Sequence, residues 1–188
     1  MPQNNDYAKT YREDGFVIVR NLFGGDDLTQ LSAELDEYKA KIEAREYRGN
    51  HMFEDDSTAR VIFNPYDFCP SLRRLIDTPE IIGLVRELLG APVRLDHTKF
   101  LCKQAKKGSI VHHHQDFYYW QDKSPNQVAL FMAIDQCTEE NGCLRLFPGS
   151  HKAGLREHKK QFHEVTGERF WECVLEPEYK HNEVKFVA

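Results

Sequence analysis

Two side chains near the middle of the sequence have the chemistry and the spacing to hold one metal ion. His114 and Asp116 are separated by a single residue within the segment 111–120, Val-His-His-His-Gln-Asp-Phe-Tyr-Tyr-Trp. On a β-strand, residues i and i+2 point to the same side, so this imidazole and this carboxylate can coordinate one cation together. One more histidine from elsewhere would complete a 2-His-1-carboxylate triad, which suits Fe(II) and leaves positions open for oxygen and a co-substrate.

The His-x-Asp pair is a weak signal when it is taken alone. The chain contains nine histidines, so such a pair will often occur by chance, and a surface hydrogen bond between the two side chains is a simpler explanation. The run of three histidines at 112–114 could instead bind zinc or nickel loosely at a surface. A second His-x-carboxylate pair, His181 and Glu183, lies in a polar stretch near the end of the sequence.

The first half of the sequence contains two segments that are typical of helices and could support such a site. Apolar residues recur at steps of three and four over residues 27–45, which predicts an amphipathic helix. A second helix is predicted after Thr78, which can cap it, with Pro79 at the first helical position and Gly90 at the end. Residues 46–70 show no clear period and are expected to form a connection or a functional loop.

Strands are predicted mainly in the second half. Residues 93–102, 109–114 and 144–147 are strand-like, and residues 128–134 form an unbroken apolar run that is expected to be buried on both faces. A short β-branched run at residues 15–19 predicts a further strand before the first helix. Helices followed by short strands indicate an α+β fold in which the strands form a sandwich or barrel.

Length and composition are those of one soluble globular domain over residues 1–188, with 40% hydrophobic and 29% charged residues. A net charge of -5 argues against nucleic-acid binding, because phosphate neutralisation needs a basic surface. Five cysteines without a CxxC spacing favour a reduced, intracellular setting, and the polar N-terminus lacks the apolar core of a signal peptide. No apolar run is long enough to cross a membrane, so the cytoplasm is the default location.

Several motifs occur in the order and spacing of a known family. They are His-Gln-Asp-Phe-Tyr-Tyr-Trp at 114–120, Glu-Asn-Gly-Cys-Leu-Arg-Leu-Phe-Pro-Gly-Ser-His-Lys at 140–152, Asp-Gly-Phe-Val-Ile-Val-Arg-Asn-Leu-Phe at 14–23, and Leu-Leu-Gly at 88–90 before the strand with Lys103. From about residue 10 to residue 152, the sequence resembles the phytanoyl-CoA dioxygenase family.

The resemblance implies a double-stranded β-helix, or jelly roll, with flanking N-terminal helices. It also implies an enzyme that couples oxidative decarboxylation of 2-oxoglutarate, with Fe(II) and O2, to the oxidation of a substrate. His114 and Asp116 would be the iron ligands, and an Asp at position 116, where related halogenases carry a small residue, favours hydroxylation or another oxidation. No basic cluster indicates a site for coenzyme A phosphates, so a small organic substrate is expected.

The resemblance also implies contacts around the metal. Contacts to 2-oxoglutarate would fall near Lys99 and Phe131, although a solvated strand position and core packing explain these two residues equally well. The aromatic residues 118–120 would line the mouth of the pocket, where they could hold an apolar or ring-shaped substrate, while packing explains some of them. His112 and His113 would lie just outside the ligands.

Two further parts of the family's site have no counterpart after residue 152. The family supplies its second histidine ligand from a late strand, followed by an arginine that pairs with the distal carboxylate of 2-oxoglutarate. The chain is then either a partial one whose missing segment completes the site, or a non-catalytic jelly roll that binds metal or a partner. The intact His-x-Asp pair favours a partial chain.

Other histidines could replace the missing ligand. His158, His163 or His181 could do so, although their Lys- and Glu-rich surroundings indicate solvated segments. A jelly roll without its late strands would also expose strand edges and apolar surface. The 188 residues alone are therefore expected to be poorly soluble, or stabilised by a partner.

Overall fold

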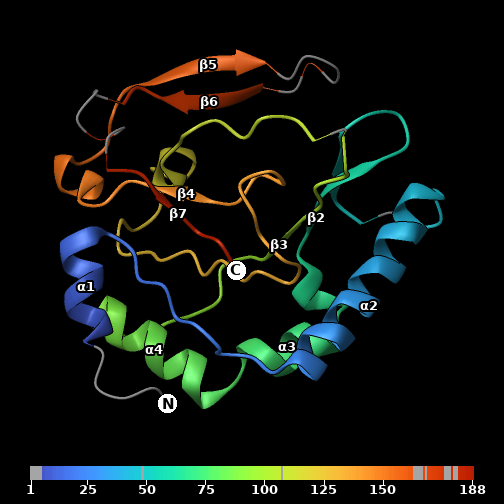
Figure 1. Cartoon of the computed structure of the whole chain (residues 1–188), viewed down its shortest axis with the longest axis horizontal. Helices are drawn as coiled ribbons and strands as arrows, with labels where there is room; N and C mark the ends of the chain where they lie inside the picture. The colour runs from blue at the N-terminus through green and yellow to red at the C-terminus, as the bar shows by residue number, and fades with distance from the viewer. Residues whose placement is uncertain are drawn as a thin grey trace.

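The computed structural model describes residues 6–47, 49–106, 108–162, 167, 169–175, 179 and 182–188. In Figure 1 the helices line one side of the molecule, and the strands of the second half lie opposite them. The helices are α1 (Tyr7–Asp14), α2 (Gly25–Glu43), α3 (Pro70–Ile76) and α4 (Pro79–Leu89), with short 3-10 turns η1 (Pro65–Asp67), η2 (Asp116–Tyr119) and η3 (Ser150–Ala153). None of the helices in the described part of the chain combines the length and the hydropathy that a membrane span requires.

Helix α2 carries the main core. Its apolar stripe buries Leu31, Leu35 and Ile42, as the spacing predicts, although the helix begins and ends two residues before the predicted bounds. Leu31 and Leu35 lie in one cluster with Leu72 and Leu75 of α3. Because each fully buried leucine contributes about 1.5–3 kcal/mol, this contact fixes α2 against α3.

Helix α4 begins and ends as predicted. Thr78 is the N-cap, and its side-chain oxygen accepts a hydrogen bond from the backbone N–H of Ile81 at 3.4 Å. Pro79 occupies the first helical position, and Gly90 closes the helix in the left-handed conformation with φ of 64°. These signals are local, so the sequence alone was sufficient to place both ends.

The described strands form three small antiparallel sheets. The first sheet contains, in this order, β1 (His51–Phe53), β2 (Ala59–Phe63) and β3 (Lys99–Leu101). The second pairs β4 (Arg145–Leu146) with β7 (Val184–Lys185). The third pairs β5 (His158–Phe162) with β6 (Arg169–Cys173). The first sheet packs on α2, where Ile62 of β2 and Ile42 of α2 are fully buried in one cluster. The chain is therefore a mixed helix and sheet protein.

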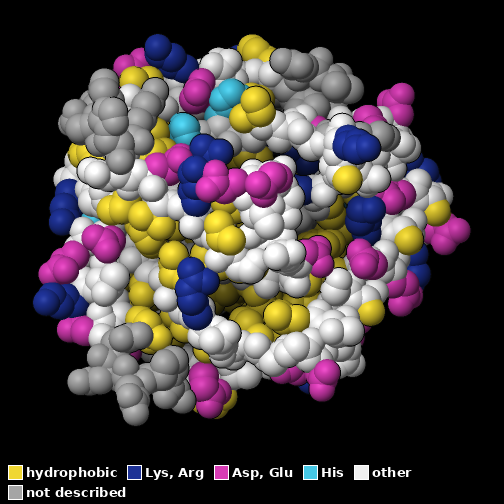
Figure 2. Space-filling view, in the orientation of Figure 1, with side chains coloured by type: hydrophobic (Ala, Val, Ile, Leu, Met, Phe, Trp, Pro, Cys, Tyr) yellow, Lys and Arg dark blue, Asp and Glu magenta, His cyan; other side chains and the backbone are white. Residues whose placement is uncertain are grey.

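Three predicted strands do not form. Residues 15–19, 109–114 and 128–134 have no partner strand among the described residues. The run 128–134 is also not buried on both faces, because Leu130 and Phe131 are 42% and 45% exposed. An apolar run becomes a strand only where another strand pairs with its backbone groups, and that partner is not encoded locally. Hydrophobic side chains accordingly gather around a hollow on the face drawn in Figure 2.

Other predicted strands are shorter than expected. The strand predicted over residues 93–102 is reduced to β3, and the one over 144–147 to β4. Residues 46–70, expected to be a connection, contain β1, β2 and η1. Strand β3 needs β2 as its partner, so the length of β3 is set by a pairing between segments that lie far apart in the sequence.

Two glycines of the motif 140–152 form turns, and one of these turns joins the two halves of the chain. Gly142 and Gly149 both have positive φ, 82° and 75°, a conformation that glycine adopts readily in turns. The backbone N–H of Gly149 donates to the carbonyl of Asp14 at 2.9 Å. His151 Nε2 lies 3.1 Å from the carbonyl of Arg12, to which it donates. His151 thus has a structural contact, holding the turn against the end of α1.

Candidate metal centre

The candidate ligands lie where an extended segment enters a short turn. Gln115 is extended, with φ of -107° and ψ of 122°, and the 3-10 turn η2 starts at the next residue. The turn is closed by the backbone N–H of Tyr118, which donates to the carbonyl of Gln115 at 2.9 Å. Because Gln115 is extended, the side chains of His114 and Asp116 project to the same side, although the segment pairs with no strand in the described part of the chain.

His114 and Asp116 face one another directly. His114 Nε2 lies 3.3 Å from Asp116 Oδ1. The other ring nitrogen of His114, Nδ1, lies 2.8 Å from the carbonyl oxygen of His112. A carbonyl can only accept, so Nδ1 carries a proton and donates it, and the remaining lone pair on Nε2 points toward the carboxylate.

Two acceptors that face one another need a cation between them. A proton on His114 Nε2 would fill this place: the hydrogen bond to Asp116 raises the pKa of His114, and the hydrogen bond from His114 lowers the pKa of Asp116. A metal ion can replace the proton, because a neutral imidazole nitrogen and a carboxylate oxygen are both ligands for Fe(II). The side chains are 33% and 48% exposed, so an ion can reach them. The pair therefore fits a metal.

The three consecutive histidines do not converge. The imidazole of His112 stacks on Phe170, with ring centroids 4.9 Å apart, and its Nδ1 lies 3.3 Å from a carboxylate oxygen of Glu172. The ring of His113 meets the ring of Phe147 edge-on at 4.9 Å. Within the described residues, no group of three His, Cys, Asp or Glu side chains gathers as a metal site. The rival zinc or nickel site is therefore not formed by this run.

His158, considered as a substitute ligand, lies in a different environment from the one expected. His158 was expected in a solvated segment, but its side chain is only 7% exposed and it is the first residue of strand β5. Its Nε2 accepts a hydrogen bond from the backbone N–H of Gln115 at 3.2 Å, so its lone pair is already used. His163 and His181 lie outside the described residues, and with them the pair of His181 and Glu183.

The two residues expected near 2-oxoglutarate lie in different places. Lys99, on β3, has its Nζ 5.3 Å from the ring centroid of Trp120. Its positive charge makes a small contribution that lowers the pKa of Asp116 and partly offsets the raised pKa of His114. Phe131 instead meets the ring of Phe186 edge-on at 6.0 Å. The structure thus brings Lys99 toward the pair, while the ring of Phe131 contacts Phe186 in the C-terminal segment.

The aromatic residues 118–120 divide between the pair and its surroundings. The ring of Tyr119 lies edge-on to the ring of His114 at 6.0 Å, so it borders the pair. Tyr118 stacks on His158 with ring centroids 3.9 Å apart, which is packing. Trp120 meets His97 edge-on at 4.7 Å. Ring packing therefore accounts for Tyr118 and Trp120, while Tyr119 borders the pair.

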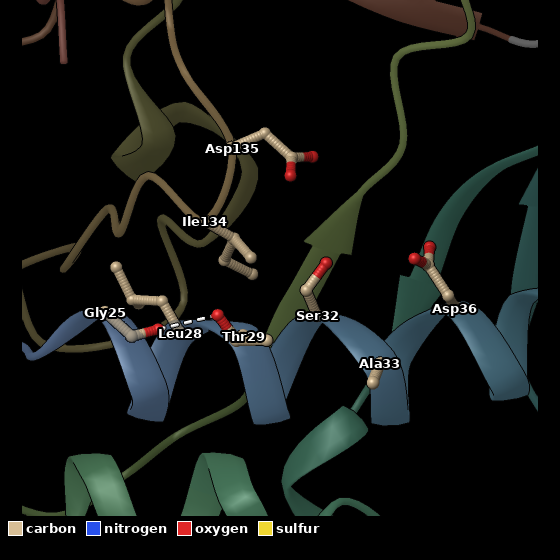
Figure 3. Close-up of a pocket in the computed structure, with 8 residues that line it drawn as sticks. All are labelled: Gly25, Leu28, Thr29, Ser32, Ala33, Asp36, Ile134 and Asp135. Atoms are coloured by element: carbon tan, nitrogen blue, oxygen red, sulfur yellow. Dashed lines mark hydrogen bonds between the residues drawn. The ribbon is translucent and has the colours of Figure 1, made fainter.

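A separate groove runs along helix α2. It has a volume of about 530 Å³ and is lined by Gly25, Leu28, Thr29, Ser32, Ala33 and Asp36 of α2 with Ile134 and Asp135. Figure 3 shows the side chain of Asp135 on the opposite side of the groove from the row of α2 side chains. The lining includes two carboxylates, no imidazole and no residue of 112–120, so this groove is not the metal centre.

The residues that hold the His114–Asp116 segment in place were not predicted from the sequence. The hairpin of β5 and β6, with Arg156 just before it, makes several hydrogen bonds to the segment 112–119. Two of these bonds are made by Gln115, which lies between the candidate ligands. The sequences of the two strands, His-Lys-Lys-Gln-Phe and Arg-Phe-Trp-Glu-Cys, lack the alternation of polar and apolar residues that predicts a strand. Nothing in the sequence indicated which distant segment the hairpin would cover.

The fold and the pair define a class, a mixed helix and sheet protein with a His-x-Asp donor pair, and comparison with known proteins narrows it. The family model for phytanoyl-CoA dioxygenase matches residues 11–186. The L-proline trans-4-hydroxylase of Streptomyces griseoviridis is 32% identical over 157 residues, which cover 81% of this chain and 57% of the hydroxylase. The chain belongs to the phytanoyl-CoA dioxygenase family.

Other relatives carry related names. The ectoine dioxygenase of Bordetella parapertussis is 32% identical over 168 residues, which cover 83% of this chain and 54% of that enzyme. The peroxisomal phytanoyl-CoA dioxygenase of Rattus norvegicus is 29% identical over 169 residues, which cover 81% of this chain and 49% of that enzyme. The chain spans about half the length of these curated relatives.

Proposed function

We propose that this chain contributes the His-x-Asp half of the metal site in an Fe(II)- and 2-oxoglutarate-dependent dioxygenase. The observation that carries the proposal is the orientation of the pair: His114 Nε2 and Asp116 Oδ1 face one another at 3.3 Å, with Nδ1 of the same imidazole held by a carbonyl. Membership of the phytanoyl-CoA dioxygenase family supports the choice of iron and of 2-oxoglutarate over other metals and co-substrates.

The residues of this chain would have distinct roles. When bound, Fe(II) with 2-oxoglutarate and O2 would supply the oxidising chemistry. His114 and Asp116 would hold the metal, the His112 carbonyl would keep the proton of His114 on Nδ1, and the ring of Tyr119 would limit the access of water to the imidazole. Lys99 and Phe131 would contact the keto acid, with Lys99 attracting a carboxylate.

The same proposal extends to the fold and the remaining ligands. We infer that residues 1–188 belong to one double-stranded β-helix domain, which supplies the exposed run 128–134 with partner strands. The third protein ligand and the arginine for 2-oxoglutarate would come from outside the described residues, within which no three-ligand group gathers. Relatives named for L-proline and ectoine support a small organic substrate, hydroxylated or otherwise oxidised.

The test is 2-oxoglutarate consumption by the natural gene product with Fe(II) under air. We expect consumption by the wild-type protein, and a loss of more than about 100-fold in His114→Ala and Asp116→Ala, because even groups one step removed from metal ligands cost about 10–100-fold. His51→Ala, in β1 and outside the pair, is the control and should leave the rate unchanged. Full turnover by His114→Ala would contradict the proposal, and metal binding without any consumption would favour the non-catalytic alternative.

A further inference from the structure

The two strands of the hairpin, β5 and β6, contact the ligand segment at several residues between His113 and Tyr119. The backbone N–H of Cys173 donates to the carbonyl of His113 at 2.6 Å, and that of Trp171 donates to the hydroxyl oxygen of Tyr119 at 3.1 Å. In Figure 1 this hairpin lies at the edge of the molecule away from helices α3 and α4. The segment with the candidate ligands is therefore held by an element that follows it by some 40 residues in the sequence.

His158, the first residue of this hairpin, holds the turn between the two candidate ligands. Its Nδ1 lies 3.0 Å from the carbonyl of Arg156, so Nδ1 donates, because a carbonyl can only accept. Its Nε2 must then accept, and it does so from the backbone N–H of Gln115 at 3.2 Å. One neutral tautomer satisfies both bonds, and the ring face is covered by Tyr118 at 3.9 Å between centroids.

The side chain of Gln115 makes a second connection to the chain just before β5. Its Nε2 donates to the carbonyl of Gly154 at 2.9 Å, and its Oε1 accepts from the backbone N–H of Arg156 at 2.8 Å. Gln115 is therefore fixed by four hydrogen bonds: its backbone N–H donates to His158, its carbonyl accepts from the N–H of Tyr118, and its side-chain amide makes two more. Because it is the single residue between His114 and Asp116, its φ and ψ decide how those two side chains are spaced.

We propose that His158 and Gln115 are positioning residues for the candidate metal site. His158 accepts a hydrogen bond from the backbone N–H of Gln115, which lies between the two ligands. The side chain of Gln115 bonds to the backbone of residues 154–156. Together these bonds keep His114 Nε2 and Asp116 Oδ1 on one side at a fixed separation. Neither residue would touch the metal. The proposal rests on the proposed function, in that it assigns these residues to the support of the same metal pair.

The test compares two substitutions of His158 in the natural gene product. His158→Phe keeps a ring to stack on Tyr118 and removes the acceptor, whereas His158→Gln keeps an acceptor oxygen. In the metal-free protein we expect faster hydrogen exchange of the Gln115 amide in His158→Phe and slow exchange in His158→Gln. Anaerobic calorimetry with Fe(II) alone should show binding weakened by about tenfold in His158→Phe, the lower end of the effect of groups that orient ligands, and mostly restored in His158→Gln.

Several results would overturn the proposal. Fe(II) affinity equal to wild type in a folded His158→Phe protein would do so, and so would unchanged exchange at the Gln115 amide. If His158→Phe does not fold, Gln115→Met replaces it, since it removes the two side-chain bonds and leaves the backbone N–H in place; an unchanged Fe(II) affinity in that variant counts against the proposal. His51→Phe controls for the loss of an imidazole elsewhere.

Failure of the proposed function can be told apart from failure of this inference. If the wild-type protein binds no Fe(II), the proposed function is wrong. The nitrogen NMR shift of His114 Nε2 in the metal-free protein then decides the inference, because this atom faces Asp116. The inference is supported if the chemical shift in His158→Phe differs from wild type and that in His158→Gln is close to wild type. It is contradicted if the chemical shift is the same in all three proteins.

Discussion

At the scale of single residues, one carboxylate joins the two helices of the core. Glu34 of α2 accepts hydrogen bonds from the hydroxyl of Ser71 at 2.6 Å, from the backbone N–H of Ser71 at 3.0 Å and from the thiol of Cys69 at 3.0 Å. The N-cap position of α3 is Cys69, which makes no side-chain cap bond. Glu34, on α2, therefore accepts a hydrogen bond from the N–H of Ser71 in the first turn of α3, a group that has no partner within its own helix.

These bonds also change the ionisation of both partners. Burial acts to raise the pKa of Glu34, but the hydrogen bonds from Cys69 and Ser71, with the charge of Arg74, outweigh it and the pKa is lowered. Burial, with the hydrogen bond to Glu34, raises the pKa of the Cys69 thiol to about 11. At neutral pH the thiol thus stays protonated and remains a donor to an ionised carboxylate.

Replacing Glu34 should therefore destabilise the protein in a pH-dependent way. Because its pKa is lower folded than unfolded, Glu34 contributes stability above its ordinary value of 4.5, and this contribution is lost as the pH falls through the lowered value. We expect Glu34→Gln to reduce the free energy of unfolding by about 1–2 kcal/mol near neutral pH, with the difference from wild type shrinking in acid. Urea unfolding at a series of pH values measures this, and Glu37→Gln, on the exposed face of α2, is the control. A difference that is the same at every pH would contradict it.

At the scale of elements, the link between α1 and the second half of the chain depends on one glycine. Gly15 ends α1 with φ of 85°, a conformation that residues with a side chain rarely adopt. A Cβ at this position would clash with the imidazole of His151, whose ring packs against the end of the helix. The absence of a side chain is therefore required twice, by the backbone conformation and by the close approach of His151.

Gly15→Ala should consequently lower stability by about 1–3 kcal/mol, the usual cost of holding a residue with a side chain in this conformation. The matched control is Gly25→Ala in the first turn of α2, where a Cβ would meet nothing within 4 Å. That substitution should be neutral, or stabilising by about 0.4–1 kcal/mol, because it restricts the unfolded chain. Thermal unfolding of the two variants provides the comparison, and equal effects would show that the turn against α1 does not depend on Gly15.

At the scale of the whole molecule, apolar side chains are exposed next to the candidate ligands. Ile110 and Val111, which directly precede the three histidines, are 74% and 56% exposed. Leu130 and Phe131, in the run predicted to be a buried strand, are exposed as well. These exposed apolar residues lie in extended segments that pair with no strand among the residues the structure describes, and such a surface favours association.

The 188-residue chain should therefore self-associate at micromolar concentrations. Replacing Ile110 and Val111 together by serine should reduce both the association, measured by light scattering after gel filtration, and the binding of a hydrophobic dye. Leu95→Ser is the control, because it removes a single exposed leucine outside both segments. A wild-type chain that is monomeric and binds no dye would refute this expectation.

The sequence by itself determined the features that depend on neighbours along the chain. The cap, first residue and end of α4 were all predicted, because each signal lies within a few residues of the bond that it makes. The apolar stripe of α2 was predicted for the same reason. His114 and Asp116 were predicted to share a side, since they are two residues apart and only the conformation of Gln115 intervenes.

Only the tertiary structure decided what depends on distant partners. The runs 15–19 and 128–134 carry strand-like residues, but no pattern within them specifies a strand to pair with, and the structure gives them none among the described residues. His158 looked like a solvated residue in a basic stretch, and its acceptor role depends on Gln115, 43 residues earlier. Hydrogen bonds of this kind form where two segments meet in space, so their donors and acceptors become partners only when the chain is folded.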